Sequence, residues 1–148
     1  MISSAIKESN PNCAECFASL RLYGDALIPA QITRLFQVEP SDSAAKGEMS
    51  KSPSGKSRQA STGRWIMGTD GKLSSSSLEK HIEWILDRLA SIDIKAEDLP
   101  GVESADIFCY WNSASGHGGP QFSPHLMSRL AQNGLTLGLD IYFASGDF

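Results

Sequence analysis

A chain of 148 residues is long enough for one domain, which at this size buries about 70% of the surface that its unfolded form exposes. Its 41% hydrophobic and 20% charged residues are ordinary for a globular protein, and its net charge of −4 argues against nucleic acid as a partner. No apolar run approaches the ~18 residues of a membrane helix, and the start has no secretory signal, so we expect a cytoplasmic protein that does not enter membranes.

The first forty residues predict a tail, a strand and a helix. Residues 1–14 are polar and aperiodic, and we interpret them as a flexible tail before a single domain over residues 15–148. The stretch "ECFASLRLYG" alternates apolar and polar side chains, which is typical of a strand with two different faces. The stretch "IPAQITRLFQ" has helical spacing, with Pro29 suited to the first turn.

The middle of the chain contains both the weakest and the strongest secondary-structure patterns in the sequence. Residues 41–63 are rich in serine, lysine and glycine, which predicts a long exposed loop or a hairpin tip with a short strand near residues 45–48. The stretch "GRWIMGT" is predicted to be a strand. The following "SSSSLEKHIEWILDRLASI" predicts a helix, because it carries one apolar stripe and because Ser76 and Glu79 have the spacing of a capping box.

The last third predicts two more strands around a helix. "SADIFCYW" and "TLGLDIYF" both alternate, and between them Ser123 and Pro124 are a natural N-cap and first-turn residue. The element order is therefore strand, helix, two strands, helix, strand, helix, strand. We expect an α+β fold, in which two or three helices pack on one face of a mixed, mostly antiparallel sheet. The first part is similar to the split βαβ arrangement of ferredoxin-like folds.

Several phrases in this order and spacing resemble a bacterial family of domains of unknown function, number 4279. They are "LRLYGDALIPAQITRLFQVEP", "KGE", "TGRWIMGT", "SLEKHIEWILDRL", "ADIFCYW" and "FSPHLMSRLAQNGLTLGLDIY". The resemblance runs from about Cys16 to Tyr142 and implies a compact α+β domain of bacterial origin. It implies no catalytic motif and no cofactor. Small domains of this kind include toxin-immunity proteins, which is an analogy of type only.

Two constellations of reactive side chains are candidate sites. Cys13 and Cys16 have the two-residue gap of a zinc or redox pair, but a structural zinc site needs two further ligands, and no second pair is present. A small-molecule or enzymatic pocket is the other alternative, formed between the sheet and the loop Gly116–Pro120 with Asp106 and His117.

The favoured hypothesis is a non-enzymatic interaction domain that binds a protein partner or a second copy of itself. If the aliphatic residues of the alternating strands face the helices, the opposite face carries aromatic side chains and an arginine, which interface cores favour. Two outcomes remain open: the tail or the 41–63 segment covers this face, or a partner does. The residues expected on the face are Phe17, Arg21, Tyr23, Phe108, Tyr110, Asp140 and Tyr142, with either Trp65, which we favour, or Ile66 from the neighbouring strand.

Overall fold

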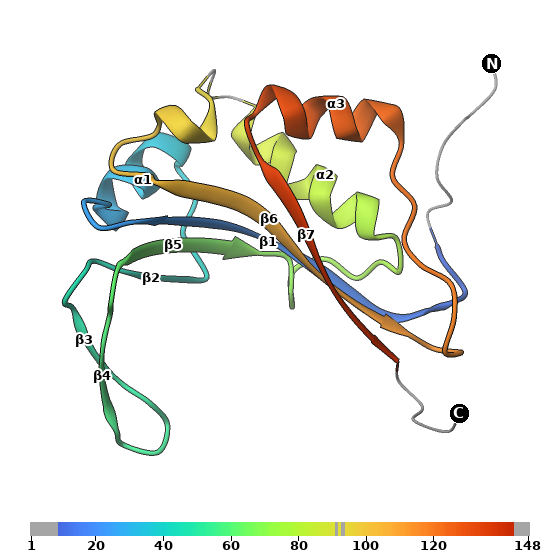
Figure 1. The fold of residues 1–148 in the computed structure, drawn as a ribbon, viewed down its shortest axis with the longest axis horizontal. Coiled ribbons are helices and arrows are strands. Elements are labelled where there is room, and N and C mark those ends of the chain that lie inside the picture. The colour runs from blue at the N-terminus through green and yellow to red at the C-terminus, as the bar shows by residue number, and fades with distance from the viewer. Residues whose placement is uncertain (1–8, 91, 93, 144–148) are drawn as a thin grey trace.

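The structure is a computed structural model that describes residues 9–90, 92 and 94–143. Its helices and strands follow the order that the sequence predicts, with one additional hairpin (Figure 1). The elements are β1 (Cys13–Gly24), α1 (Pro29–Phe36), β2 (Asp42–Ala44), β3 (Met49–Lys51), β4 (Ser57–Gln59), β5 (Gly63–Gly68), α2 (Leu78–Leu89), the 3₁₀ turn η1 (Ala96–Asp98), β6 (Ser104–Ser113), α3 (Pro124–Gln132) and β7 (Thr136–Phe143).

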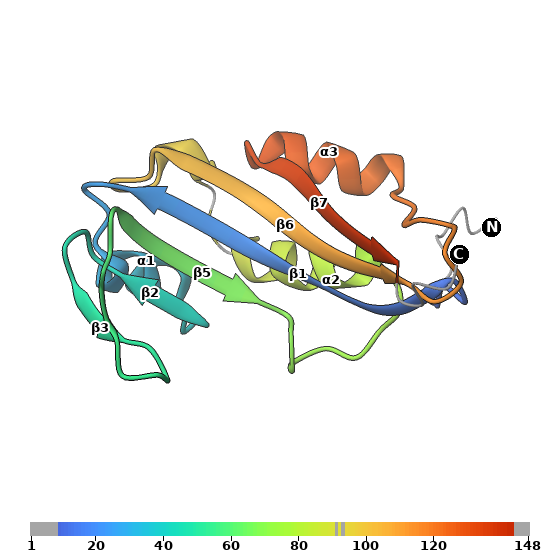
Figure 2. The ribbon, with the colours of Figure 1, turned by 60° about the horizontal axis from the view of Figure 1, so that its bottom comes forward.

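The main sheet has five strands in the order β2-β5-β1-β6-β7. Every neighbouring pair is antiparallel except β6 and β7, which are parallel and are joined through α3. All three α-helices lie on one side of this sheet, and Figure 2 shows them behind the strands. The prediction of an α+β fold with a mostly antiparallel sheet is confirmed.

The core lies between the helices and one face of the sheet. In β1 every second side chain from Cys16 to Leu22 is buried, because successive residues of a strand point to opposite faces. Opposite this row, α2 contributes the apolar stripe that its sequence predicts, from Leu78 through Ile82 and Ile85 to Leu89. None of the described helices has the length and apolar character needed to span a bilayer.

The N-terminus of α2 begins one residue later than predicted. Ser77, not Ser76, is the N-cap, and its hydroxyl accepts from the backbone N–H of Lys80. Glu79 does not close a capping box on its own helix. Its buried carboxyl group instead accepts the backbone N–H of Ser123 at 2.6 Å, at the N-cap of α3. In a run of four serines the spacing alone does not select the cap, and the contact with α3 is long-range.

The segment expected to be a long exposed loop or a hairpin tip contains three short strands, and the strand expected near residues 45–48 is instead a turn between two of them. Asp42–Ala44 pairs with β5 as the edge strand β2, and β3 pairs with β4 in a two-stranded hairpin. We call residues 49–59 the basic hairpin, and Figure 1 shows it extending away from the sheet. Because its side chains are exposed almost throughout, the sequence shows no burial period there.

The predicted N-terminal tail is only partly described. Asn10 is fixed to the body of the domain, since its backbone N–H donates to Ser76 Oγ and its side-chain amide to the Gly119 carbonyl. Cys13 and Ala14, also expected in the tail, belong to β1, and residues 1–8 lie outside the described residues.

Candidate functional site

The side of the sheet opposite the helices carries aromatic and charged side chains. The strand register places them together, and Figure 2 shows this side in front with no helix over it. Most are partly exposed, and Tyr142 is 49% exposed. We call this surface the outer face; its members are Phe17, Arg21, Tyr23, Ile66, Asp106, Phe108, Tyr110, Asp140 and Tyr142.

Three rings form a continuous cluster across β1, β6 and β7. Phe17 lies opposite Tyr110 in the register, and the two rings stack with centroids 4.8 Å apart. Tyr110 also contacts Tyr142, at 5.3 Å between centroids. A hydrogen bond to Asp140 raises the pKa of the Tyr142 phenol. Aromatic pairs at these distances favour one another beyond simple area burial, so the cluster is a rigid apolar platform.

Arg21 and Asp106 form the polar centre of the outer face. They are cross-strand partners, and Arg21 Nε and Nη2 donate to the two carboxyl oxygens of Asp106 at 2.8 and 2.6 Å. The same guanidinium lies 4.2 Å from the centre of the Phe108 ring. Hydrogen bonding to Asp106 raises the pKa of Arg21. Each of the two charges is therefore paired with the other across the strands.

Trp65 was expected on this face and does not lie there. Its side chain is buried on the helix side, where Nε1 donates to Thr33 Oγ1 at 3.0 Å and the ring contacts Phe36 edge-on. The register explains the difference, because Trp65 pairs with the inward-facing Leu22. Ile66, paired with Arg21, occupies the outer position on β5.

The structure does not bring Asp106 and His117 together. Asp106 lies near the start of β6 and is bound to Arg21, whereas His117 is exposed in the loop that follows the other end of this strand. The seven residues from Asp106 to Ser113 alone span about 23 Å of strand. His117 contributes only its backbone carbonyl to a local turn, where it accepts from Ser113 Oγ.

Cys13 and Cys16 do lie together, on the buried side of β1. A shift in register between Cys13 and Glu15 puts both thiols on the same face, although the odd spacing of three positions would place them on opposite faces of a regular strand. Burial raises the pKa of both thiols, so neither has the thiolate character of a reactive cysteine. Among the described residues there is no group of three or more side chains suited to hold a metal.

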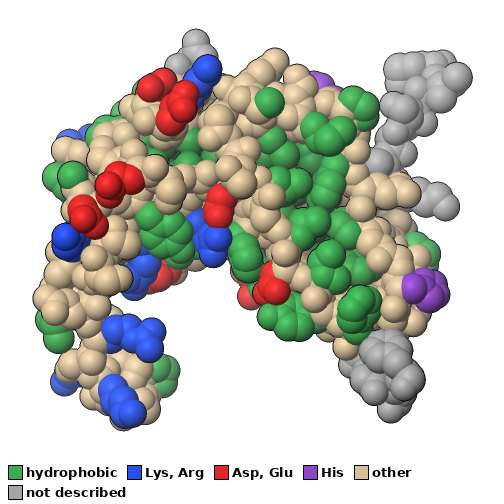
Figure 3. Space-filling view, viewed as in Figure 1, with side chains coloured by type: hydrophobic (Ala, Val, Ile, Leu, Met, Phe, Trp, Pro, Cys, Tyr) green, Lys and Arg blue, Asp and Glu red, His purple; other side chains and the backbone are tan. Residues whose placement is uncertain are grey.

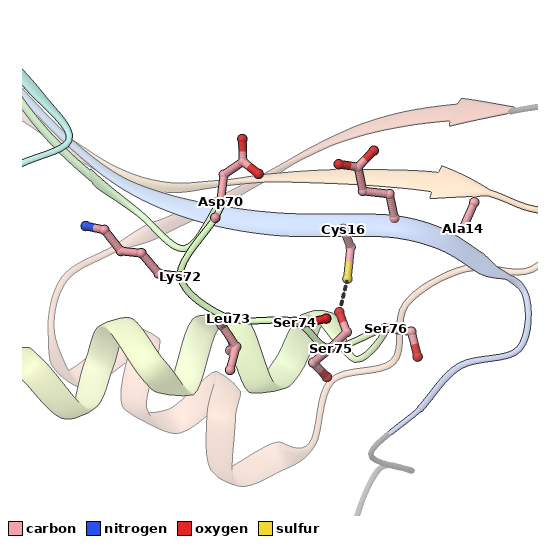
Figure 4. Close-up of a pocket in the computed structure, with 10 residues that line it drawn as sticks. Ala14, Cys16, Asp70, Lys72, Leu73, Ser74, Ser75 and Ser76 are labelled. Carbon is pink, nitrogen blue, oxygen red and sulfur yellow. Dashed lines mark hydrogen bonds between the residues drawn. The ribbon is translucent and has the colours of Figure 1, made fainter.

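A shallow groove of about 650 Å³ lies beside Cys16 and the loop of residues 70–76 (Figure 4). In this view the Cys16 thiol points to the Ser75 carbonyl, 3.3 Å away, while Asp70 and Lys72 extend away from that contact. The nearby His81 is 1% exposed, and both of its ring nitrogens are engaged, by Thr69 Oγ1 and the Ser75 carbonyl. The imidazole of His81 is therefore not available to the groove, whose lining combines serine side chains with Glu15, Asp70 and Lys72.

Two exposed features were not assigned to a candidate site from the sequence. The basic hairpin flanks the outer face at one end, and Figure 3 shows a hollow between its Lys and Arg side chains and the body of the protein. Leu139 and Ile141 were expected in the core and do lie on the helix side, yet each is 43% exposed. The available signal for this exposure was their position on the edge strand β7, which carries apolar residues at alternate positions.

These observations define a small α+β domain whose helices cover one face of a mixed sheet, while the other face presents paired charges and stacked rings. A family profile described as a domain of unknown function (DUF4279) matches residues 14–144. The chain belongs to this family. The comparisons with curated proteins and with solved structures found no match.

Proposed function

We propose that this protein is a non-enzymatic interaction domain whose outer face and basic hairpin together bind an acidic segment of another protein. The observation that supports this most directly is the three-ring cluster of Phe17, Tyr110 and Tyr142 on a sheet face that no described helix covers. Solvated faces of antiparallel sheets normally carry polar side chains, whereas aromatic rings are the residues that anchor protein interfaces.

The charge distribution supports an acidic partner. Residues 49–59 contain Lys51, Lys56 and Arg58 and no acidic side chain, so the basic hairpin carries +3 in a chain of net −4. The remainder of the chain therefore carries −7, and the positive charge that the fold presents beside the outer face is concentrated on one arm. A negatively charged segment of a partner would be attracted to this arm and repelled by the acidic remainder of the chain.

The arrangement of the core gives further support. We infer that β2, β5, β1 and β6, with α1 and α2, correspond to the split βαβ pattern of ferredoxin-like folds, with β7 as an added strand. RNA-recognition domains with a sheet of this type bind their ligand on the face opposite the helices, where aromatic side chains provide the contact area.

A displayed random-peptide library, panned against the purified protein, tests the proposal. We expect enriched peptides to combine acidic with apolar residues. Their affinity should fall about tenfold or more in Tyr110→Ala and in Lys56→Glu, and it should also fall with added salt. Lys95→Glu is the matched control, because it reverses one exposed charge away from both surfaces and should leave the affinity unchanged.

Two results would contradict the proposal. One is a set of enriched peptides whose affinity is indifferent to Tyr110→Ala while circular dichroism shows the variant folded. The other is binding of a single-stranded oligonucleotide with the same dependence on Lys56, which would identify a different class of partner.

A further inference from the structure

The last strand of the sheet has an apolar free edge. Among the described residues, positions 136–142 of β7 pair only with β6, so the other edge of this stretch presents backbone N–H and C=O groups. Leu139 and Ile141 are exposed on its helix side and Tyr142 on its outer side. Natural edge strands are usually protected by lysine, proline or a bulge, because an open apolar edge recruits another strand. Strand β7 contains no lysine, arginine or proline, and Asp140 is its only charge.

The helix α3 extends the apolar surface beside this edge. Arg129 bonds to Asp87 and thereby identifies the flank of α3 that faces α2. Met127 is two residues earlier, which at about 100° per residue places it on the opposite flank. It is 50% exposed, and Figure 3 shows hydrophobic side chains continuing from the region of α3 down to that of β7. We call Met127, Leu139, Ile141 and Tyr142 the edge patch.

We propose that the edge patch is a homodimer interface, in which β7 pairs antiparallel with β7 of a second copy and the two sheets become one. A two-fold axis perpendicular to the sheet keeps the helix sides of both copies on the same side, so apolar residues meet apolar residues. This inference is independent of the partner proposed for the outer face, although such a dimer would join two outer faces into one continuous surface.

The distribution of side chains along β7 favours one register. With the axis at Leu139, Leu139 faces its own copy, Leu137 faces Ile141, and Asp140 faces Gly138, which leaves room for the carboxylate. Moving the axis to Asp140 would place two like charges directly opposite each other, which is destabilising. A strand from a different protein would need a matching order of apolar, acidic and glycine residues. A second copy of β7 supplies this order by symmetry.

The exposed area is of the size that a dimer uses. The four side chains of the edge patch are 43–50% exposed. At about 150–250 Å² for a large side chain they leave roughly 350 Å² accessible on each copy. Stable interfaces bury about 800 Å² per partner, and the backbone of an eight-residue strand and the adjoining flank of α3 lie beside the patch to extend it.

Sedimentation of the full chain at micromolar concentrations measures the assembly. We expect a species of twice the 16.0 kDa chain mass, and we expect Leu139→Lys to weaken association by about tenfold or more. Leu35→Lys is the matched control, because Leu35 is a comparably exposed leucine on α1, and this variant should remain dimeric. Circular dichroism establishes that both variants are folded.

A cysteine trap tests the register itself. Directly opposed residues of antiparallel strands have Cα atoms 4.5–5.5 Å apart, within the range of a disulfide, so Leu139→Cys should crosslink two copies under mild oxidation. Thr136→Cys should not, because its copies would be about 20 Å apart. The three native cysteines are buried and should not contribute. A monomer at every concentration, or a dimer that Leu139→Lys leaves intact, overturns the proposal.

Discussion

His81 is the most constrained polar side chain in the core. Because a backbone carbonyl only accepts, the 2.8 Å contact with Ser75 places the ring proton on Nε2, and Nδ1 then accepts from the Thr69 hydroxyl at 2.6 Å. Thr69 is itself bonded to the backbone of Ala18 in β1. The neutral imidazole therefore ties the loop before α2 to the central strand, which is a structural role and not a catalytic one.

This network predicts a pH-dependent stability. Burial lowers the pKa of His81, so the unfolded chain, whose imidazole has a pKa of about 6.5, binds a proton more readily than the folded protein. The stabilisation contributed by the neutral His81 is complete above about pH 6.5. It is lost as the pH falls through the lower pKa that this side chain has in the folded protein. We expect the free energy of unfolding in urea to decrease from pH 7.5 to pH 5, and to decrease less in His81→Gln.

His125→Gln provides the comparison for this measurement. His125 is exposed on α3, so this variant should keep the wild-type decrease. Identical pH profiles for wild type and His81→Gln would mean that other groups carry the effect.

At the scale of elements, Glu79 joins two helices that are remote in sequence. Its carboxyl group lies in the first turn of α2 and accepts the backbone N–H of Ser123, the N-cap residue of α3. The Ser123 hydroxyl in turn accepts from the N–H of Leu126, so these hydrogen bonds hold the start of α3 to the first turn of α2. Since α3 leads directly into β7, this contact also positions the edge strand.

Removing that acceptor should destabilise the domain at a defined place. Glu79→Ala leaves the Ser123 N–H without its partner, and we expect it to lower the free energy of unfolding by about 1–3 kcal/mol. Glu79→Gln keeps a side-chain oxygen and should cost less. Chemical denaturation measures both, and hydrogen exchange should show the faster amide at Ser123. Equal losses in the two variants would argue against the acceptor role.

At the scale of the whole molecule, the basic hairpin lies outside the core. Its side chains are almost entirely exposed, and its base is closed by backbone hydrogen bonds between Glu48 and Ala60 and between Gly47 and Ala60. The arm therefore contributes charge and shape beside the outer face without supporting the packing of the sheet.

Shortening the arm tests whether it contributes to binding without contributing to stability. Replacing residues 49–59 by Asn-Gly gives a two-residue turn between Glu48 and Ala60. We expect the melting temperature to change by no more than a few degrees and the far-ultraviolet circular dichroism to keep its shape, because little buried surface is lost. Binding of acidic peptides should be lost. Unfolding of the shortened protein would instead assign the arm a structural role.

The sequence predicted most of the elements because burial imposes a period on them. Alternation identified β1, β6 and β7, and the apolar stripe identified α2. Residues 42–59 escaped because their strands are held by backbone hydrogen bonds, which leave no pattern in exposed side chains. The outer face was predicted except for Trp65. Trp65 and Ile66 are adjacent and both apolar, so the sequence does not indicate which of them faces the helices until the pairing of β5 with β1 is known.

The sequence by itself determined the α+β class, the faces of β1, β6 and β7, and the family, because hydrophobic periodicity and capping residues are local features of the chain. Only the tertiary structure decided that Glu79 serves the other helix, that Cys13 and Cys16 share one buried face, and that Leu139 and Ile141 are left exposed at an edge. These properties depend on which distant segments become neighbours, and that is set by the packing of the whole chain and not by any local stretch of it.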